Sequence, residues 1–382
     1  MAVIIAILVF GALILIHEFG HYLTARIFHV EIHEFSIGMG PKLISYRSRR
    51  TGIRYSIRLL PFGGFVSMPG ELGEDPDARP RFGFEAVPPL PETPEENPDD
   101  IGYTIANKGN TLSSRPAPQR LVVHAAGAVM NLVLGFLLLF ALCFSLAYGS
   151  PEHSMLGTTT VSGIYPADDG TSSADFGLRV GDEIISVAGQ RVYISDQLMY
   201  QIMRYGYTGE PVEVKVRHAD GTRETLSIVF PIEEIEGQRF GSFDFTVLPE
   251  ERTLGSVLRH VFYRSVYIVE MIWESIFDLF SGRYTIDAVA GPLGTAGAIT
   301  EAAKSGFNNL LYITIVISIN LGVFNLLPIP PLDGGHILYT LYEIIFRKPI
   351  PQKLTLALDS FFTVFFFGFL IFITIKDLVG FF

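Results

Sequence analysis

The chain alternates long apolar segments with polar ones, and four of the apolar segments are long enough to cross a bilayer. They are predicted at residues 1–28, 119–148, 308–334 and 354–382. A bilayer core requires about 20 apolar residues in a helix, since each residue adds about 1.5 Å. We therefore expect an α-helical integral membrane protein with four transmembrane helices.

The polar segments between these spans predict further structure. Residues 29–118 begin with β-branched and aromatic residues broken by Gly and Pro, which is typical of short strands and tight turns. An acidic, proline-rich loop follows at 71–100. Residues 149–252 are numerous enough for one compact domain. Residues 253–307 have charges between apolar residues at helical spacing, which predicts an amphipathic interfacial helix and a connector. Residues 335–353 are expected to form a cytoplasmic connector helix.

The glycine-rich stretch at 54–70 is expected to contribute to a curved β-hairpin or sheet that dips toward the membrane. Irregular or edge backbone at membrane depth is tolerated where it is buried or lines a cavity, and such an edge can pair with an extended peptide. We predict that Gly63 and Gly64 contact the substrate there. The alternative is a plain surface hairpin.

Three polar residues interrupt the first apolar span. The motif His17-Glu18-Phe19-Gly20-His21 places two imidazoles four residues apart, so they share one face of a helix. The spacing is that of a zinc hydrolase in which the glutamate polarises a bound water. Polar residues at membrane depth are costly and usually functional, which argues against a chance match. A signal peptide is excluded, because no basic segment precedes the apolar run and no small-residue cleavage site follows it.

The third span ends in Pro328-Ile-Pro-Pro-Leu-Asp333-Gly-Gly-His336. Proline ends a helix, and irregular backbone near membrane depth implies a cavity or protein contacts. The carboxylate of Asp333 would complete three protein ligands and leave the fourth zinc position open. Asp333 could also cap the next helix, and His336 is a rival third ligand. In the second span, His124 and Asn131 lie nearly on one face and can either face the metal cavity or serve packing.

Composition supports a membrane protein and excludes other classes. Of 382 residues, 49% are hydrophobic and 31 are phenylalanine. The net charge of −11 argues against a nucleic-acid partner, which requires a basic face. The single cysteine, Cys143, excludes a disulfide framework.

The segment from Ala174 to Val192 resembles the GLxxGDxIxxVxGxxV stretch of PDZ domains. We therefore expect an inserted α+β PDZ domain that binds a peptide or protein ligand by strand addition. The alternative is a domain that only blocks access by its bulk.

The orientation follows from the basic residues. Five arginines follow the first span, namely Arg47, Arg49, Arg50, Arg54 and Arg58. Three basic residues lie between the third span and the fourth, namely Arg347, Lys348 and Lys353. Residues 149–168 contain no Lys or Arg. The positive-inside rule predicts an extracytoplasmic PDZ domain and an active site toward the cytoplasmic side of a bacterial inner or plasma membrane.

Three features together resemble one family. The motif HEFGH in the first span, FNLLPIPPLDGG in the third and the PDZ-like insert between them are similar to the bacterial site-2 proteases, the RseP-like intramembrane zinc metalloproteases. The resemblance implies that His17, His21 and Asp333 bind Zn²⁺, that Glu18 is the general base and that Asn325 helps to hold the substrate. It also implies cleavage of transmembrane segments of single-pass membrane proteins, such as anti-sigma factors or remnant signal peptides, within the lipid membrane.

The chain departs from the family in some respects. Many members carry two tandem PDZ domains, whereas this chain has room for one, and Ala128 stands where relatives usually have proline. An alternative function is a non-catalytic membrane adaptor that captures partners with the PDZ domain. A membrane di-iron hydroxylase would require several more histidine clusters than the sequence contains.

Overall fold

A computed structural model describes most of the chain as two compact units. The described residues are 2–69, 110–149, 156–167, 170, 172–235, 238–251, 253–282, 286 and 289–380. The first unit comprises residues 1–135 and 272–382, and the second comprises residues 136–271. The predicted acidic loop at 71–100 lies outside the described residues.

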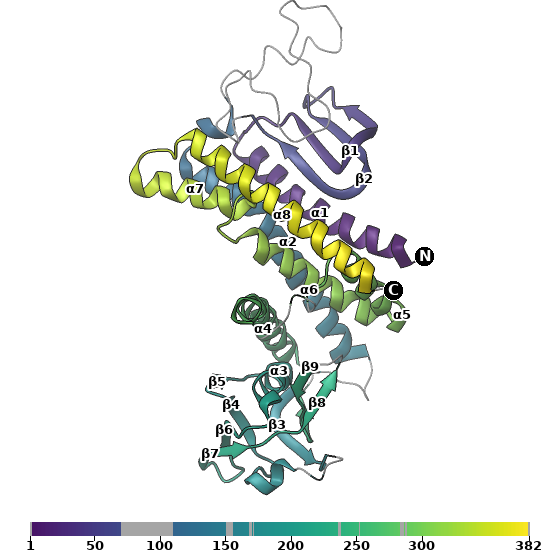
Figure 1. Ribbon diagram of the computed structural model, residues 1–382, viewed down its shortest axis with the longest axis vertical. Helices are drawn as coiled ribbons and strands as arrows, with labels where there is room; N and C mark the ends of the chain where they lie inside the picture. Colours follow the sequence, from purple (N-terminus) through teal and green to yellow (C-terminus); the bar gives the residue numbers. More distant parts are fainter. Residues whose placement is uncertain are drawn as a thin grey trace, which may run out of the picture. The chain divides into compact units, whose positions relative to one another are not determined.

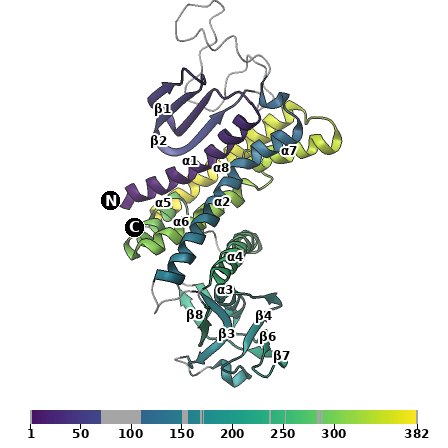
Figure 2. The ribbon, with the colours of Figure 1, turned by 180° about the vertical axis from the view of Figure 1, so that it is seen from behind.

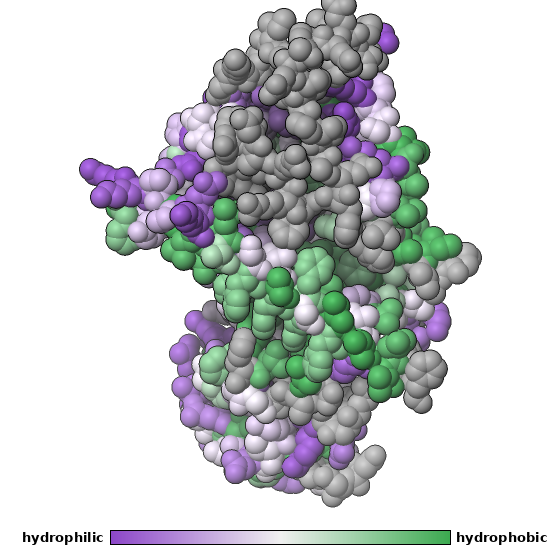
Figure 3. Space-filling view, turned by 45° about the horizontal axis from the view of Figure 1, so that its top comes forward, coloured by the Kyte–Doolittle hydropathy of each residue, from purple (hydrophilic) through white to green (hydrophobic). Residues whose placement is uncertain are grey.

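Among the described residues, four helices are long and apolar enough to cross a membrane, which agrees with the predicted number. They are α1 (Ala2–Ile27), α2 (Ala117–Gly149), α6 (Phe307–Asn325) and α8 (Gln352–Gly380). Helix α6 ends earlier than the predicted span, because the prolines that follow cannot continue a helix. Many large apolar side chains of these helices are exposed, and hydrophobic residues cover much of this region on the face drawn in Figure 3.

Among the described residues, three further helices lie outside these four candidate spans and outside the sheet of the second unit. They are α4 (Leu254–Ser281), α5 (Pro292–Ser305) and α7 (Asp333–Phe346). Helix α5 begins with a proline at its first position, where a missing N–H costs nothing. Helix α7 begins at Asp333, so the turn between α6 and α7 contains all three prolines of the motif.

The sheet of the first unit is built from two long strands, β1 (Glu34–Arg47) and β2 (Arg54–Ser67). Residues 34–37 pair with 54–57 on one side and with 64–67 on the other, and 44–47 pair with the far side of 54–57. Each strand is longer than the short strands that were predicted, at 14 residues. Glycines with positive φ in both strands allow each strand to bend, so that its two halves behave as separate strands. Segment 64–67 becomes one edge of the sheet.

The apolar face of this sheet packs on the membrane helices. Phe35 and Val66 form a buried cluster with Ala25 of α1 and Val123 of α2. Both views of the ribbon show the sheet lying over α1 (Figures 1 and 2). This packing brings segment 64–67 beside the helix that carries the HEFGH motif.

The second unit contains a six-stranded sheet with the order β10-β3-β4-β6-β7, in which β5 pairs with β4. The strands are β3 (Gly157–Ile164), β4 (Glu183–Val187), β5 (Gln190–Arg191), β6 (Val212–Arg217), β7 (Arg223–Ile228) and β10 (Phe245–Pro249). A hairpin of β8 (Ile232–Ile235) and β9 (Gln238–Gly241) and the helix α3 (Ser195–Tyr205) complete it. Leu198 and Ile202 of α3 pack into the core of the sheet, which makes this unit an α+β domain.

Within the second unit, α4 holds α3 with polar and aromatic side chains. Arg264 donates a hydrogen bond to Asp196 at 2.5 Å, and the ring of Tyr263 stacks on Tyr193 with centroids 4.3 Å apart. Part of the charged side of α4 therefore contacts protein, and its position on a membrane surface stays a prediction.

Candidate metal centre

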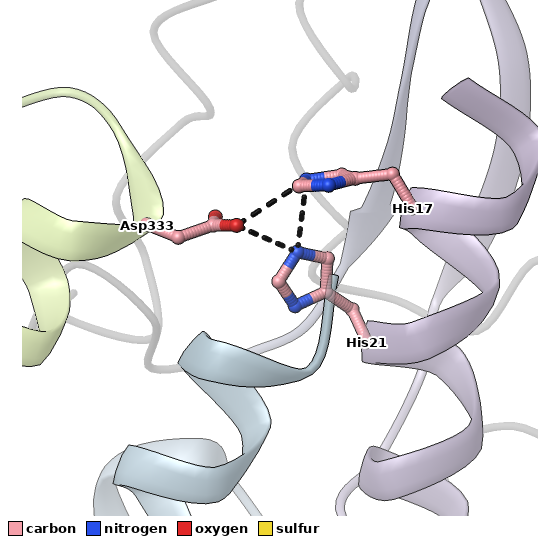
Figure 4. A group of neighbouring side chains, drawn as sticks. All are labelled: His17, His21 and Asp333. Carbon is pink, nitrogen blue, oxygen red and sulfur yellow. Dashed lines mark hydrogen bonds and ion pairs between the residues drawn. The ribbon is translucent and has the colours of Figure 1, made fainter. Parts of the chain in front are cut away.

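Helix α1 presents His17 and His21 on one face, as their spacing requires. Their Nε2 atoms lie 3.3 Å apart, and the rings point toward one another (Figure 4). The side chain of His21 is buried and that of His17 is partly exposed. The Nε2 atoms of both rings therefore face the same space between the two side chains.

Asp333 approaches this point from the beginning of α7. Its Oδ2 atom lies 3.3 Å from Nε2 of His17 and 3.3 Å from Nε2 of His21. The tight turn before α7 requires glycine, since a β-carbon at Gly334 would stand 2.0 Å from the carbonyl oxygen of Leu327. The proline-rich turn and the glycine pair thus bring a carboxylate from one end of the chain to the two histidines at the other end.

The three donor atoms fit a zinc ion. Zinc bonds to histidine and carboxylate are about 2.0–2.1 Å long, so two ligand atoms of a tetrahedral site lie about 3.3–3.4 Å apart. All three separations here are 3.3 Å. Oδ2 of Asp333 is buried and has no hydrogen-bond partner among the described residues, which a metal bond would satisfy. Two nitrogens and one oxygen leave the fourth position for water or substrate.

Helix α2 supplies a hydrogen bond that orients His21. The Nδ1 atom of His21 lies 2.8 Å from the carbonyl oxygen of Val123. A metal-binding histidine usually donates its other N–H in this way, which fixes the tautomer and the ring orientation. Sequence analysis did not identify Val123, because a backbone acceptor leaves no signal in the residue type.

Two glycines allow α1 and α2 to approach closely at this site. A β-carbon at Gly20 would stand 2.3 Å from the carbonyl oxygen of Ala126, and one at Gly127 would stand 2.3 Å from Nε2 of His21. Sequence analysis also missed the role of Gly127. The run of small residues from Ala125 to Ala128 was the available signal, since small residues permit close helix packing.

A cavity of about 130 Å³ adjoins the metal centre at His17. It is lined by Ile14, His17, Glu18, Gly63, Gly64, Asn131, Leu321 and Asn325. The cavity therefore brings the predicted base Glu18 together with all three residues predicted to contact substrate. Asn131 also lines this cavity; the sequence allowed either a place at the metal cavity or a role in helix packing for this residue.

His336 does not join the group of donor atoms. Its ring stacks on that of His124, with centroids 5.2 Å apart and an angle of 18° between the planes. Asp333 does not cap α7 either, because the capping position is Leu332 and no side chain makes the capping hydrogen bond. Among the described residues, the one group of three side chains arranged to hold a metal is His17, His21 and Asp333.

Comparison with known proteins identifies the family of the chain. The model of the family "Peptidase family M50" matches residues 5–369. A protein of Clostridium perfringens is 30% identical over 99% of each chain. The "Regulator of sigma-W protease RasP" of Bacillus subtilis is 29% identical over 92% of each chain, and the "Zinc metalloprotease RasP" of Shouchella clausii is 28% identical over 91% of each. These matches confirm the predicted family, the peptidase activity and zinc as the cofactor. The chain belongs to peptidase family M50.

Proposed function

We propose that this protein is an intramembrane zinc endopeptidase that hydrolyses peptide bonds within transmembrane segments of single-pass membrane proteins. The observation that carries the proposal is the convergence of three metal-binding atoms, all 3.3 Å apart. Two of them belong to α1, a helix of membrane-spanning length, and the third belongs to Asp333 at the beginning of α7. Charged and metal-binding groups at membrane depth carry a high free-energy cost, so their presence there implies a function at that depth. This favours a reaction that takes place within the membrane.

In the proposed mechanism, His17, His21 and Asp333 hold the zinc ion. When bound, the ion lowers the pKa of water and polarises the carbonyl group that is attacked. Glu18 follows His17 directly on α1 and lines the cavity, where its carboxylate takes the proton of the attacking water and passes it to the leaving amine.

The edge of the sheet is proposed to bind the substrate in extended form. A β-carbon at Gly64 would stand 3.0 Å from Cγ of Glu18, so segment 64–67 runs directly past the proposed base. Strand addition to this edge would unwind a transmembrane helix and expose its peptide bonds. The side-chain amide of Asn325, which lines the same cavity, is available to bind the unwound backbone.

The second unit is proposed to be a single extracytoplasmic PDZ domain occupying residues 149–252. Its sheet, its helix α3 and the sequence GLRVGDEIISVAGQRV support this assignment. Strand β10 is the last strand in the sheet order, so one edge of it is available for a peptide ligand among the described residues. The positions of the basic residues support the proposed orientation, with the metal centre toward the cytoplasm.

The proposed substrates are single-pass proteins such as anti-sigma factors or remnant signal peptides. The name of the Bacillus subtilis relative, a regulator of sigma-W protease, supports the first of these.

Replacement of Glu18 by glutamine tests the proposal. The purified Glu18→Gln protein should retain zinc but lose cleavage of a transmembrane model substrate, because the amide cannot accept the proton. Glu301→Gln is a matched control, since the Glu301 side chain is 72% exposed on α5, and its activity should equal that of the parent. Full activity of Glu18→Gln would exclude this mechanism. An unchanged cellular phenotype of the inactive variant would favour the adaptor role.

A further inference from the structure

Asn131 of α2 is fully buried at the wall of the cavity, beside a zinc-binding histidine. Its Nδ2 atom lies 3.5 Å from Nδ1 of His17. Its other amide atom, Oδ1, has no hydrogen-bond partner among the described residues. A buried amide with one unpaired end is costly, so this arrangement calls for a ligand or a role.

The chemistry of His17 determines which end of the amide must face it. Nε2 of His17 belongs to the group of three donor atoms, and a neutral imidazole that binds a metal through Nε2 carries its proton on Nδ1. The atom that faces Nδ1 must therefore be an acceptor. The two ends of an amide have the same shape, and their hydrogen-bond partners decide which end is oxygen. Oδ1 of Asn131 then accepts from His17, as the carbonyl oxygen of Val123 accepts from His21.

This orientation leaves the NH₂ group of Asn131 at the end of the amide that has no protein partner. Asn131 lines the same cavity as Glu18 and His17, and the exposed fraction of its side chain is 0%. A buried NH₂ donor at this wall can be satisfied by an oxygen that enters the cavity. In a peptide substrate, that oxygen is the carbonyl oxygen of the bond being cut, which gains negative charge as water adds.

We propose that Asn131 has two roles in the reaction: its Oδ1 orients His17 for zinc, and its NH₂ group donates a hydrogen bond to the substrate carbonyl oxygen. The inference rests on the proposed zinc peptidase activity and adds a catalytic residue to it. A packing role alone would not require an amide, because the backbone of Asn131 is already held by a hydrogen bond of 2.8 Å from Oγ of Ser318 to its carbonyl oxygen.

Two substitutions separate these roles in the full-length protein purified in detergent. Asn131→Asp keeps an acceptor for His17 and removes the donor, whereas Asn131→Leu removes both at similar size. Zinc affinity is measured by competition with a chelator, and kcat and KM are measured with a transmembrane model peptide. For Asn131→Leu we expect zinc affinity to fall about 10–100-fold, the usual effect of losing such a partner. For Asn131→Asp we expect zinc affinity within about 3-fold of the parent, together with a fall in kcat of about 10²–10³-fold at similar KM, as for the loss of one oxyanion donor.

The hydrogen bond from Ser318 to the backbone of Asn131 offers a control. Ser318→Ala removes only the hydrogen bond to the backbone of Asn131 and should leave zinc affinity and kcat near the parent values. Parental zinc affinity in Asn131→Leu would overturn the orienting role, and parental kcat in Asn131→Asp would overturn the donor role. If Asn131→Leu does not fold, Asn131→Asp still decides the second role. Asn131→Ala, which removes the acceptor without adding bulk, then decides the first role: a fall in zinc affinity supports it and parental zinc affinity overturns it. Activity of Glu18→Gln in the same assay would instead refute the proposed function itself.

Discussion

Gly127 of α2 lies against the imidazole ring of His21, so that a β-carbon at this position would stand 2.3 Å from the Nε2 atom of the histidine. The same β-carbon would stand 2.8 Å from Nε2 of His17. Both contacts involve the nitrogens that face Asp333. The space in which the donor atoms meet therefore exists because residue 127 has no side chain.

Gly127→Ala is expected to impair zinc binding. The added methyl group must displace one or both imidazoles, and overpacking of this kind costs about 1–3 kcal/mol, which corresponds to a loss of affinity of about 5–150-fold. Chelator competition on the purified variant measures the loss. Gly11→Ala is the matched control on α1, because a β-carbon there would meet no described atom within 4 Å. Equal zinc affinity of Gly127→Ala and the parent would show that the histidines do not occupy the described positions.

His336 is expected to stabilise the protein by stacking on His124, and it is not expected to bind the zinc ion. His336→Phe preserves a ring against His124 and should retain about one zinc ion per chain. His336→Ala should lower the unfolding temperature, since an aromatic pair contributes about 0.5–1.5 kcal/mol beyond its buried area. Metal analysis and thermal unfolding in detergent measure the two effects. Loss of zinc from His336→Phe, with zinc retained by Asp333→Ala, would reverse the assignment of the third ligand.

The proposed metal-binding residues and the proposed base Glu18 could be predicted from the sequence because they violate the pattern around them. His17, Glu18 and His21 stand in an apolar span, and Asp333 follows prolines at the end of another. Polar residues in such places are rare without a function, so the residue types alone carried the prediction. The choice of Asp333 over His336 required geometry, since both follow the same turn and both are zinc ligands in other proteins.

The surroundings of the metal centre could not be predicted in the same way. The small residues around Gly127 indicate close packing of two helices, but they do not indicate that Gly127 lies against the two histidines. The acceptor of His21 is a backbone carbonyl, that of Val123, which every residue type provides. The double pairing of β1 and β2 depends on bends at glycines such as Gly63, and a bent strand has the same alternation of residues as two short strands.

The stability of the hairpin of β6 and β7 in the second unit is expected to depend on pH. Hydrogen bonds from His218 to Asp182 at 2.8 Å and to Glu224 at 3.0 Å raise the pKa of the imidazole above its ordinary value of about 6.5. Because the folded state holds the proton more tightly, this contribution is complete below about pH 6.5 and is lost as the pH rises through the raised pKa. Protection of residues 212–228 from hydrogen exchange, corrected for the intrinsic rate, should therefore decrease from pH 6 to pH 9.

His218→Gln provides the control for this pH dependence. The amide cannot titrate, so protection of the same residues should vary much less over this range. The same decline in the parent and in His218→Gln would assign the pH dependence to another group.

X-ray absorption at the zinc edge, together with metal analysis, shows whether a zinc ion is held by residues from the two ends of the chain. We expect about one zinc ion per chain, with two imidazole nitrogens and at least one oxygen at about 2.0–2.2 Å, and loss of this zinc in both His17→Ala and Asp333→Ala. Full zinc content in both variants, with the same absorption spectrum as the parent, would show that His17 and Asp333 do not hold the ion.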